Sequence, residues 1–201
     1  CRYTNVYKIP FNVSYEEGTF AEPLSCAIYA IQKLEVSLGD ICIVLGPGPI
    51  GCMMVQLLKR RGAGKIIMVG TRDYRLRMAQ KLGADEILNV KEKDSTWYVE
   101  NLVDRIKSLT GGELTDKVIC ATASQEAAQQ ALNISGRGST VVFFGLSGPN
   151  DILKVPLLQN HLFDKNIRFS FRSPFTWNST LKALSGIVDT HSLISHQLNL
   201  E

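Results

Sequence analysis

The stretch ICIVLGPGPIG, residues 41–51, joins an apolar run directly to a glycine-rich turn. A helical pattern follows over residues 52–60, and a second apolar run comes after it at 65–69. A strand, a G-x-G-x-x-G turn, a helix and a second strand in this order are typical of a dinucleotide-binding βαβ unit. The alternative interpretation is a glycine-rich turn that binds no ligand.

Each residue of the turn has a predicted task. Gly46 allows the chain to leave the strand sharply, Gly48 lets the backbone approach a pyrophosphate, and Gly51 lets the helix lie close on the sheet. Pro49 and Ile50 start the helix, where unpaired N–H groups and the positive end of the helix dipole favour an anion. We therefore expect these five residues to hold the pyrophosphate.

Composition narrows the class of protein without naming it. The 201 residues are 45% hydrophobic and 20% charged, which is enough apolar material for one α/β domain. The net charge of +3 forms no basic stripe, so we expect no nucleic-acid partner. The sequence shows no signal peptide and no apolar run of membrane-spanning length, so we expect no membrane partner and a cytoplasmic location. The five cysteines form no C-x-x-C pair, which indicates reduced thiols.

The rest of the chain alternates between helical patterns and short apolar runs. Runs such as 118–121 and 140–144 are continuously apolar, as strands covered by helices on both faces must be. We therefore predict an α/β Rossmann fold: a doubly wound, six-stranded parallel sheet in the order 3-2-1-4-5-6, with a ligand crevice at the carboxyl ends of the first and fourth strands. The predicted strands are 41–45, 65–69, 86–89, 117–121, 139–145 and 167–171, and the predicted helices are 49–61, 73–82, 96–109, 124–132 and 176–188.

A lead-in segment precedes this alternation. Its pattern predicts a short strand at 3–9 and a helix over 15–34 that is broken or kinked around Pro23. We expect residues 1–36 to be this lead-in and residues 37–201 to be an NAD(P)-binding Rossmann domain. The sequence starts without Met and stops in mid-pattern, so we expect a fragment of a longer protein.

Three segments resemble the zinc-dependent medium-chain alcohol dehydrogenases, most of all the sorbitol and threonine dehydrogenase branch. They are EPLSC at 22–26, the turn at 46–51, and AQKLGAD at 79–85. The resemblance implies a two-domain NAD(P)-dependent enzyme that transfers a hydride to or from a small alcohol, polyol or sugar derivative. It makes residues 1–36 part of a GroES-like catalytic domain that is otherwise absent here. The alternative is a dinucleotide-binding module without catalysis, such as a sensor or a structural protein.

Zinc is implied by the family and not by the ligands in this chain. The family's zinc-binding Cys and Gly-His-Glu motifs have no counterpart here, so we expect the chain alone to bind cofactor and to do little chemistry. The resemblance places Glu22 at or next to the catalytic zinc of the whole enzyme, as a metal ligand or through the metal-bound water. The alternative for Glu22 is a solvated carboxylate at a helix start. His161, His191 and His196 are not spaced for a metal.

The resemblance also implies contacts in the later part of the chain. It places Ala121, Gly145 and Leu146 along the cofactor cleft, mostly through backbone groups, and Arg172 on the cofactor and substrate side. Ser173 stands where the sorbitol branch has Tyr, which argues against a sorbitol-type substrate. The sixth strand is expected to pair with its copy, which gives a homo-oligomer.

The end of the second strand determines the expected cofactor. By the family's spacing, the ribose-binding acid of NAD enzymes falls on Gly70, which is followed by Thr71 and Arg72. Gly70 leaves space, Thr71 can donate a hydrogen bond, and Arg72 offers a planar fork to phosphate oxygens, so NADP is favoured. NAD is the alternative if Asp73 is a displaced ribose-binding acid, although an N-cap for the next helix is its simpler role.

Overall fold

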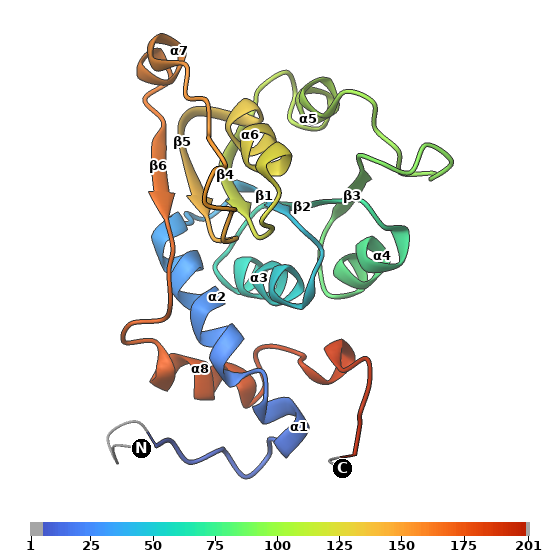
Figure 1. Cartoon of the computed structure of the whole chain (residues 1–201), viewed down its shortest axis with the longest axis vertical. Helices are drawn as coiled ribbons and strands as arrows, with labels where there is room; N and C mark the ends of the chain where they lie inside the picture. The colour runs from blue at the N-terminus through green and yellow to red at the C-terminus, as the bar shows by residue number, and fades with distance from the viewer. Residues whose placement is uncertain (1–5, 200–201) are drawn as a thin grey trace.

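The computed structural model describes residues 6–199 and confirms the predicted sheet. Six strands pair in parallel in the order β3-β2-β1-β4-β5-β6 (Figure 1). Their bounds are β1 (Ile41–Leu45), β2 (Lys65–Gly70), β3 (Glu86–Asn89), β4 (Thr115–Cys120), β5 (Ser135–Phe143) and β6 (Asn166–Phe169). The strand order reverses between β1 and β4, which opens a crevice at their carboxyl ends.

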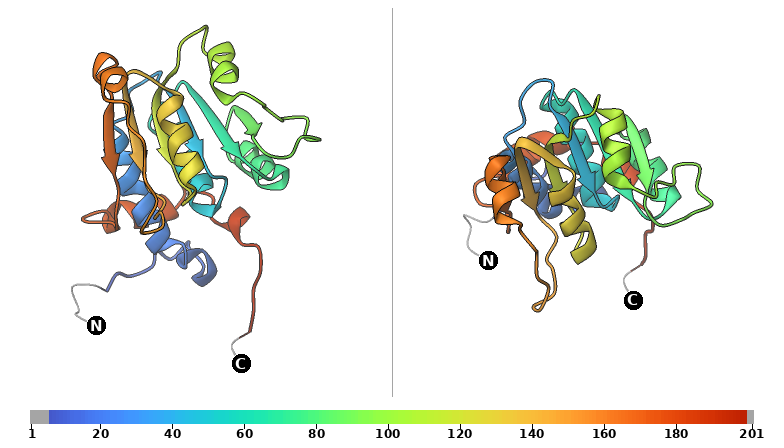
Figure 2. Two further views of the ribbon diagram at one scale, coloured as in Figure 1. Left: turned by 45° about the horizontal axis from the view of Figure 1, so that its top comes forward. Right: turned by 90° about the horizontal axis from the view of Figure 1, so that it is seen from above.

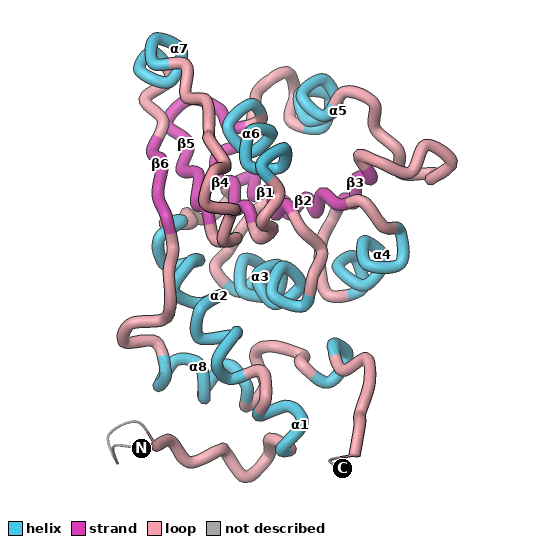
Figure 3. Tube along the Cα trace, viewed as in Figure 1, coloured by secondary structure: helices cyan, strands magenta, loops and turns pink. Residues whose placement is uncertain are grey.

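Helices cover both faces of the sheet (Figures 2 and 3), which is why β1 and the carboxyl-terminal parts of β2 and β4 are continuously apolar. In β1, Cys42 and Val44 pack into one buried cluster with α2, α3 and α4, while Ile43 and Leu45 pack into the other with α5 and α6. The helices are α1 (Tyr15–Gly18), α2 (Ala21–Leu34), α3 (Pro49–Arg60), α4 (Asp73–Lys81), α5 (Leu102–Leu109), α6 (Gln125–Asn133), α7 (Leu157–Leu162) and α8 (Trp177–Leu184).

The predicted helix over 96–109 is wrong in its first half. Asn89 at the end of β3 donates a backbone hydrogen bond to Trp97 (2.8 Å) and accepts one from Val99 (2.8 Å), so this segment runs beside β3. The helix begins only after Asn101, whose side chain accepts a hydrogen bond from the N–H of Asp104 and caps α5. Residues 97–99 therefore pair with the end of β3 instead of forming the helix that their periodicity predicts.

The lead-in segment also differs from its prediction. Residues 3–5 lie outside the described residues, and 6–9 form no strand because no described strand lies alongside to pair with them. The predicted helix over 15–34 is two helices, α1 and α2, separated at 19–20. Pro23 lies in the first turn of α2, where its missing N–H costs no helical hydrogen bond.

The last strands and helices differ from the prediction mainly at their ends. β5 begins at residue 135 instead of 139, because its pairing with β4 continues beyond a register shift between Thr115 and Lys117. β6 ends at Phe169 instead of 171, and α8 ends at Leu184, shortly before Gly186. The short helix α7 was not predicted.

Helix α2 shares its buried face with the sheet. Leu24, Ile31 and Leu34 are almost completely buried in the same cluster as the buried residues of α3. The division of the chain at residues 36 and 37 stays a prediction. Within residues 6–199, no helix combines the length and the apolar character needed to cross a membrane.

Candidate functional site

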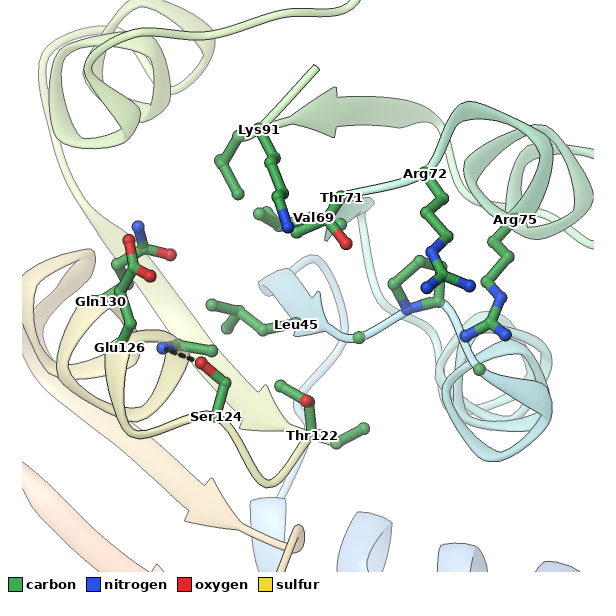
Figure 4. A pocket seen from close by; sticks show the side chains of 17 residues that line it. Leu45, Val69, Thr71, Arg72, Arg75, Lys91, Thr122, Ser124, Glu126 and Gln130 are labelled. Atoms are coloured by element: carbon green, nitrogen blue, oxygen red, sulfur yellow. Dashed lines mark hydrogen bonds between the residues drawn. The ribbon is translucent and has the colours of Figure 1, made fainter. Parts of the chain in front are cut away.

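A cavity of about 550 Å³ lies at the carboxyl ends of β1, β2 and β4, where the ligand crevice was predicted. Three chain segments form most of its wall: the glycine-rich turn after β1, the exit of β2 and the exit of β4 (Figure 4). Their lining residues include Gly46, Pro47 and Gly48; Gly70, Thr71 and Arg72; and Ala121, Thr122 and Ser124.

The structure gives the three glycines of the turn different roles. Gly46 has φ +110°, a left-handed conformation that only glycine adopts easily. A Cβ on Gly51 would lie 2.0 Å from the carbonyl oxygen of Gly46, so Gly51 permits close packing of α3 on the turn. A Cβ on Gly48 would have no atom within 4 Å, so only Gly48 combines open space with a place on the cavity wall.

The start of α3 lies directly behind this turn. Gly48 is the N-cap and Pro49 the first helical residue, so Pro49, Ile50 and Gly51 form the first turn without lining the cavity themselves. The first N–H groups of a helix have no intrahelical acceptor, and the helix dipole makes this end positive. The arrangement suits a pyrophosphate that meets Gly48 and the helix start together.

The space expected at Gly70 is occupied by protein. A Cβ on Gly70 would lie 2.5 Å from Cγ and 2.6 Å from Cδ of Pro47. The Pro47 ring therefore fills the position of a side chain at residue 70, and the two residues fit only as a pair. This close contact joins β2 to the glycine-rich turn, and it was not predicted from the sequence.

The exits of β2 and β3 give the cavity a positively charged rim. The exposed side chains of Arg72, Arg75 and Lys91 line it, together with Thr71, while Glu126 is the acidic residue of the lining (Figure 4). Sequence analysis found Arg72 and missed the other two cations. Arg75 lies three residues beyond Arg72, a helical spacing that returns it to the same side of α4 and could have identified it.

Asp73 is held on the side of β3. Its carboxylate accepts hydrogen bonds from Asn89 Nδ2 (2.6 Å) and Ser95 Oγ (2.7 Å), and these bonds, the one from Asn89 foremost, lower the pKa of Asp73 below its usual value. Asp73 does not line the cavity. The predicted N-cap role is wrong, because Arg72 occupies the N-cap position and Asp73 is the first helical residue.

The predicted cofactor residues separate into two groups. Ala121 lines the first cavity, whereas Gly145 and Leu146 line a second one of about 450 Å³. A Cβ on Gly145 would lie 2.1 Å from the carbonyl oxygen of Thr122, so the exits of β5 and β4 pack closely at the boundary between the cavities. The wall of the second cavity also contains Phe143, Phe144, Phe169, Ser170 and Phe171.

Arg172 is not brought to either cavity. It has φ +60°, and its guanidinium carbon lies 5.0 Å from the centre of the Phe171 ring. Neither cavity wall includes it. The predicted contact of Arg172 with cofactor or substrate stays a prediction.

Glu22 is the residue that the resemblance places at or next to the catalytic zinc. It is exposed in the first turn of α2, and Cys26 Sγ donates a hydrogen bond to its Oε1 (3.3 Å). Among residues 6–199, no group of three or more His, Cys, Asp or Glu side chains could hold a metal ion. The described residues therefore do not form a zinc site, and the role of Glu22 at a metal stays a prediction.

Four of the cysteines lie in the part of the chain that the structure describes, and Cys1 lies outside it. Cys26, Cys42, Cys52 and Cys120 are buried free thiols, as the sequence predicted. Burial raises the pKa of Cys42 to about 12 and that of Cys52 to about 11. Such thiols stay protonated and are poor nucleophiles or metal ligands.

Comparison with known proteins identifies the class. The profile of the zinc-binding dehydrogenase family matches residues 49–186, and the chain belongs to this family. The predicted resemblance is thereby confirmed. Sorbitol dehydrogenase of Bacillus subtilis (strain 168) is 34% identical over 198 residues, which are 98% of this chain and 54% of that protein. The chain spans about half the length of the curated relatives it matches.

Solved structures agree with this assignment. Alcohol dehydrogenase TADH from Thermus sp. ATN1 superposes with a TM-score of 0.84 at 26% identity, covering 94% of this chain and 54% of that one. A protein from Sinorhizobium meliloti 1021, solved bound to NADP, gives a TM-score of 0.80 at 22% identity over 91% of this chain and 52% of that one. The second likeness concerns the fold alone.

Proposed function

We propose that this chain is the NADP-binding part of a zinc-dependent dehydrogenase that transfers a hydride between NADP(H) and a small alcohol, polyol or sugar derivative. The family and the sorbitol dehydrogenase relatives support the reaction class. The observation that carries the choice of NADP is the exit of β2, where Arg72 and Arg75 line the cavity and the carboxylate of Asp73, next to Arg72 in sequence, is engaged with Asn89.

The residues present fit a dinucleotide. Gly48 and the start of α3 would bind the pyrophosphate, and Arg72 with Arg75 would bind a phosphate on the adenosine ribose. The nicotinamide ring supplies the hydride chemistry when the cofactor is bound. The NADP-bound Sinorhizobium meliloti protein supports the proposal to the extent that the same fold accommodates this ligand there.

The preference for NADP over NAD can be estimated from the contact of Arg72 with the ribose phosphate. A hydrogen bond to a charged group contributes about 1.5–3 kcal/mol. Arg72 is exposed, so solvent and salt reduce the gain toward the lower end of this range. Since about 1.4 kcal/mol is a tenfold change in affinity, NADP should bind roughly tenfold more tightly than NAD at low salt.

Titration of NADP⁺ and NAD⁺ into the chain and into Arg72→Ala tests the proposal. The substitution should remove most of the preference and leave the affinity for NAD⁺ unchanged. Arg77→Ala is the matched control, because Arg77 lies on the same helix with its guanidinium carbon 5.5 Å from the centre of the Trp97 ring and does not line the cavity. If the unmodified chain binds NAD⁺ more tightly than NADP⁺, and Asp73→Ala weakens the binding of NAD⁺, Asp73 is instead the ribose-binding acid.

A dinucleotide-binding module without catalysis is the second candidate, because Gly48 and the start of α3 suit a pyrophosphate whether or not a reaction follows. The two candidates differ in the gene sequence upstream of Cys1. A zinc-binding Cys and a Gly-His-Glu motif there would support the enzyme, and their absence from the whole gene would favour the module.

We also propose that the chain forms a homo-oligomer through β6. This strand is an edge of the sheet, and the side chain of Phe169 on it is 66% exposed. An edge strand offers unpaired N–H and C=O groups to another chain, and a two-fold axis lets identical edges pair.

A further inference from the structure

Tyr74 lies between the two arginines of the cavity rim. It is the second residue of α4, with Arg72 just before the helix and Arg75 next to it in sequence. Arg75 Nε donates a hydrogen bond to the Tyr74 hydroxyl oxygen (2.9 Å), and its guanidinium carbon lies 5.6 Å from the centre of the Tyr74 ring. Both arginines line the cavity, whereas Tyr74 itself does not.

The neighbouring guanidinium groups of Arg72 and Arg75 lower the pKa of Tyr74 below its usual value. The hydrogen bond that fixes the Tyr74 hydroxyl comes from Arg75 Nε, and Arg72 lies beside Arg75 at the start of α4 (Figure 4). Tyr74 as a whole is 59% exposed.

We propose that Tyr74 is a positioning residue for cofactor discrimination: its hydroxyl orders Arg75 beside Arg72 so that both arginines meet one phosphate monoester on the adenosine ribose. This inference rests on the proposed NADP preference and adds a residue that does not itself touch the ligand.

The pairing has a physical advantage. An exposed arginine has many rotamers, and ordering it upon binding costs conformational entropy. The Tyr74 hydroxyl oxygen accepts a hydrogen bond from Arg75, which orders that guanidinium group before the ligand arrives. The hydrogen bond of Arg75 uses Nε alone, so its terminal N–H groups stay free for phosphate oxygens.

Neighbouring carboxylates do not compete for this pair. Asp73 is bound by Asn89 and Ser95, and Glu92 accepts from Asn89 Nδ2 (2.9 Å) and from the backbone N–H of Asp73 (3.2 Å). Glu126 lies on α6, across the cavity (Figure 4). The two arginines can therefore direct their charge to a ligand.

The arrangement also predicts a pH effect specific to the phosphate. Ionised Tyr74 would place a negative charge on the oxygen that Arg75 Nε contacts, and this charge would weaken the attraction of the arginine pair for a phosphate dianion. The affinity for NADP⁺ should therefore fall as the pH rises toward the pKa of Tyr74, while the affinity for NAD⁺ does not follow it. A residue that merely supports the helix would not produce this difference.

The test measures dissociation constants of NADP⁺ and NAD⁺, and of adenosine 2′-monophosphate as a probe of the phosphate alone, for the chain and for Tyr74→Phe. Loss of one hydrogen bond at an exposed site should weaken NADP⁺ and the probe roughly threefold and leave NAD⁺ unchanged. The alkaline loss of NADP⁺ affinity should disappear in Tyr74→Phe. Tyr15→Phe, at an 85% exposed tyrosine on α1, is the matched control.

The variant Arg75→Ala tests whether Tyr74 and Arg75 act on the phosphate together or independently. If Tyr74 acts through the arginines, Tyr74→Phe and Arg75→Ala should be less than additive in the double variant. Unchanged NADP⁺ affinity in Tyr74→Phe, or an equal loss for NAD⁺, would overturn the positioning role while leaving the NADP proposal intact. Absence of any NADP preference in the unmodified chain would overturn the proposed function itself.

Discussion

Replacing Gly48 by Ala should weaken cofactor binding without destabilising the fold. The backbone of Gly48 has φ −78° and ψ 176°, which alanine adopts without strain, and its Cβ would meet no atom within 4 Å. Removing a glycine stabilises a protein by about 0.4–1 kcal/mol through the unfolded chain. Alanine is a poorer N-cap than glycine by a few tenths of a kcal/mol or more, so these effects nearly cancel. We expect the free energy of unfolding to change by less than about 0.5 kcal/mol.

The new methyl group would stand where Gly48 faces the cavity. A pyrophosphate kept from the start of α3 loses at least one hydrogen bond to a charged group, worth about 1.5–3 kcal/mol. The dissociation constant of NADP⁺ should therefore rise by tenfold or more, to roughly a hundredfold. NAD⁺ should weaken by the same factor, since both dinucleotides carry the pyrophosphate.

Urea unfolding and NADP⁺ titration of the same samples measure the two effects separately. Gly51→Ala is the opposite control, because its Cβ would lie 2.0 Å from the carbonyl oxygen of Gly46 and should destabilise the fold by about 1–3 kcal/mol. Unchanged NADP⁺ affinity in folded Gly48→Ala would refute the approach of phosphate to this turn. Unfolding of Gly48→Ala would refute the open space at its Cβ.

Three further predictions concern packing, assembly and acid stability. Gly70→Ala should lower the free energy of unfolding by about 1–3 kcal/mol, because the Cβ at 70 would lie 2.5 Å from the Pro47 ring. Adding Pro47→Ala should recover part of that loss in urea unfolding, and additive losses in the double variant would contradict this coupling. Phe169→Lys should shift a concentration-dependent oligomer toward monomer in light scattering, whereas a chain that is monomeric at every concentration would refute pairing through β6. The lowered pKa of Asp73 implies that the hydrogen bonds to its carboxylate stabilise the fold above its usual pKa, and that this stabilisation is lost as the pH falls below about 3.8. The melting temperature of Asp73→Asn should therefore fall less steeply with decreasing pH in that range than the melting temperature of the unmodified chain. Parallel curves for the two proteins would contradict this prediction.

Strong local patterns made most of the fold predictable. The run at 41–45 is apolar without interruption and leads into glycines at fixed spacing, so strand, turn and helix were assigned together. The central strands repeat this apolar character, and the rule for parallel crossovers then limits the strand order. Segments whose conformation depends on distant partners were not predictable: 97–99 pairs with Asn89, and the first part of β5 pairs with β4 beyond a register shift.

The candidate site was predictable where backbone geometry requires a residue type. Gly46 and Gly51 follow from the turn, and Arg72 follows from its distance to the turn. The Pro47 ring against Gly70 was not predictable, because the two residues come from different segments and meet only in the folded chain. The hydrogen bonds of Asp73 to Asn89 and Ser95 were missed for the same reason.

The burial of α2 determines where this chain could be cut for recombinant work. A boundary drawn from the alternating pattern would start a shortened protein at residue 37 and discard α2. That protein would expose the side of the core on which Leu24, Ile31 and Leu34 now lie, since they belong to one buried cluster with Val44 and Met54. Contiguous apolar surface of this kind promotes aggregation. An expression boundary placed before Val13, which belongs to the same cluster, would keep this surface covered and would also retain Ser14, which caps α1.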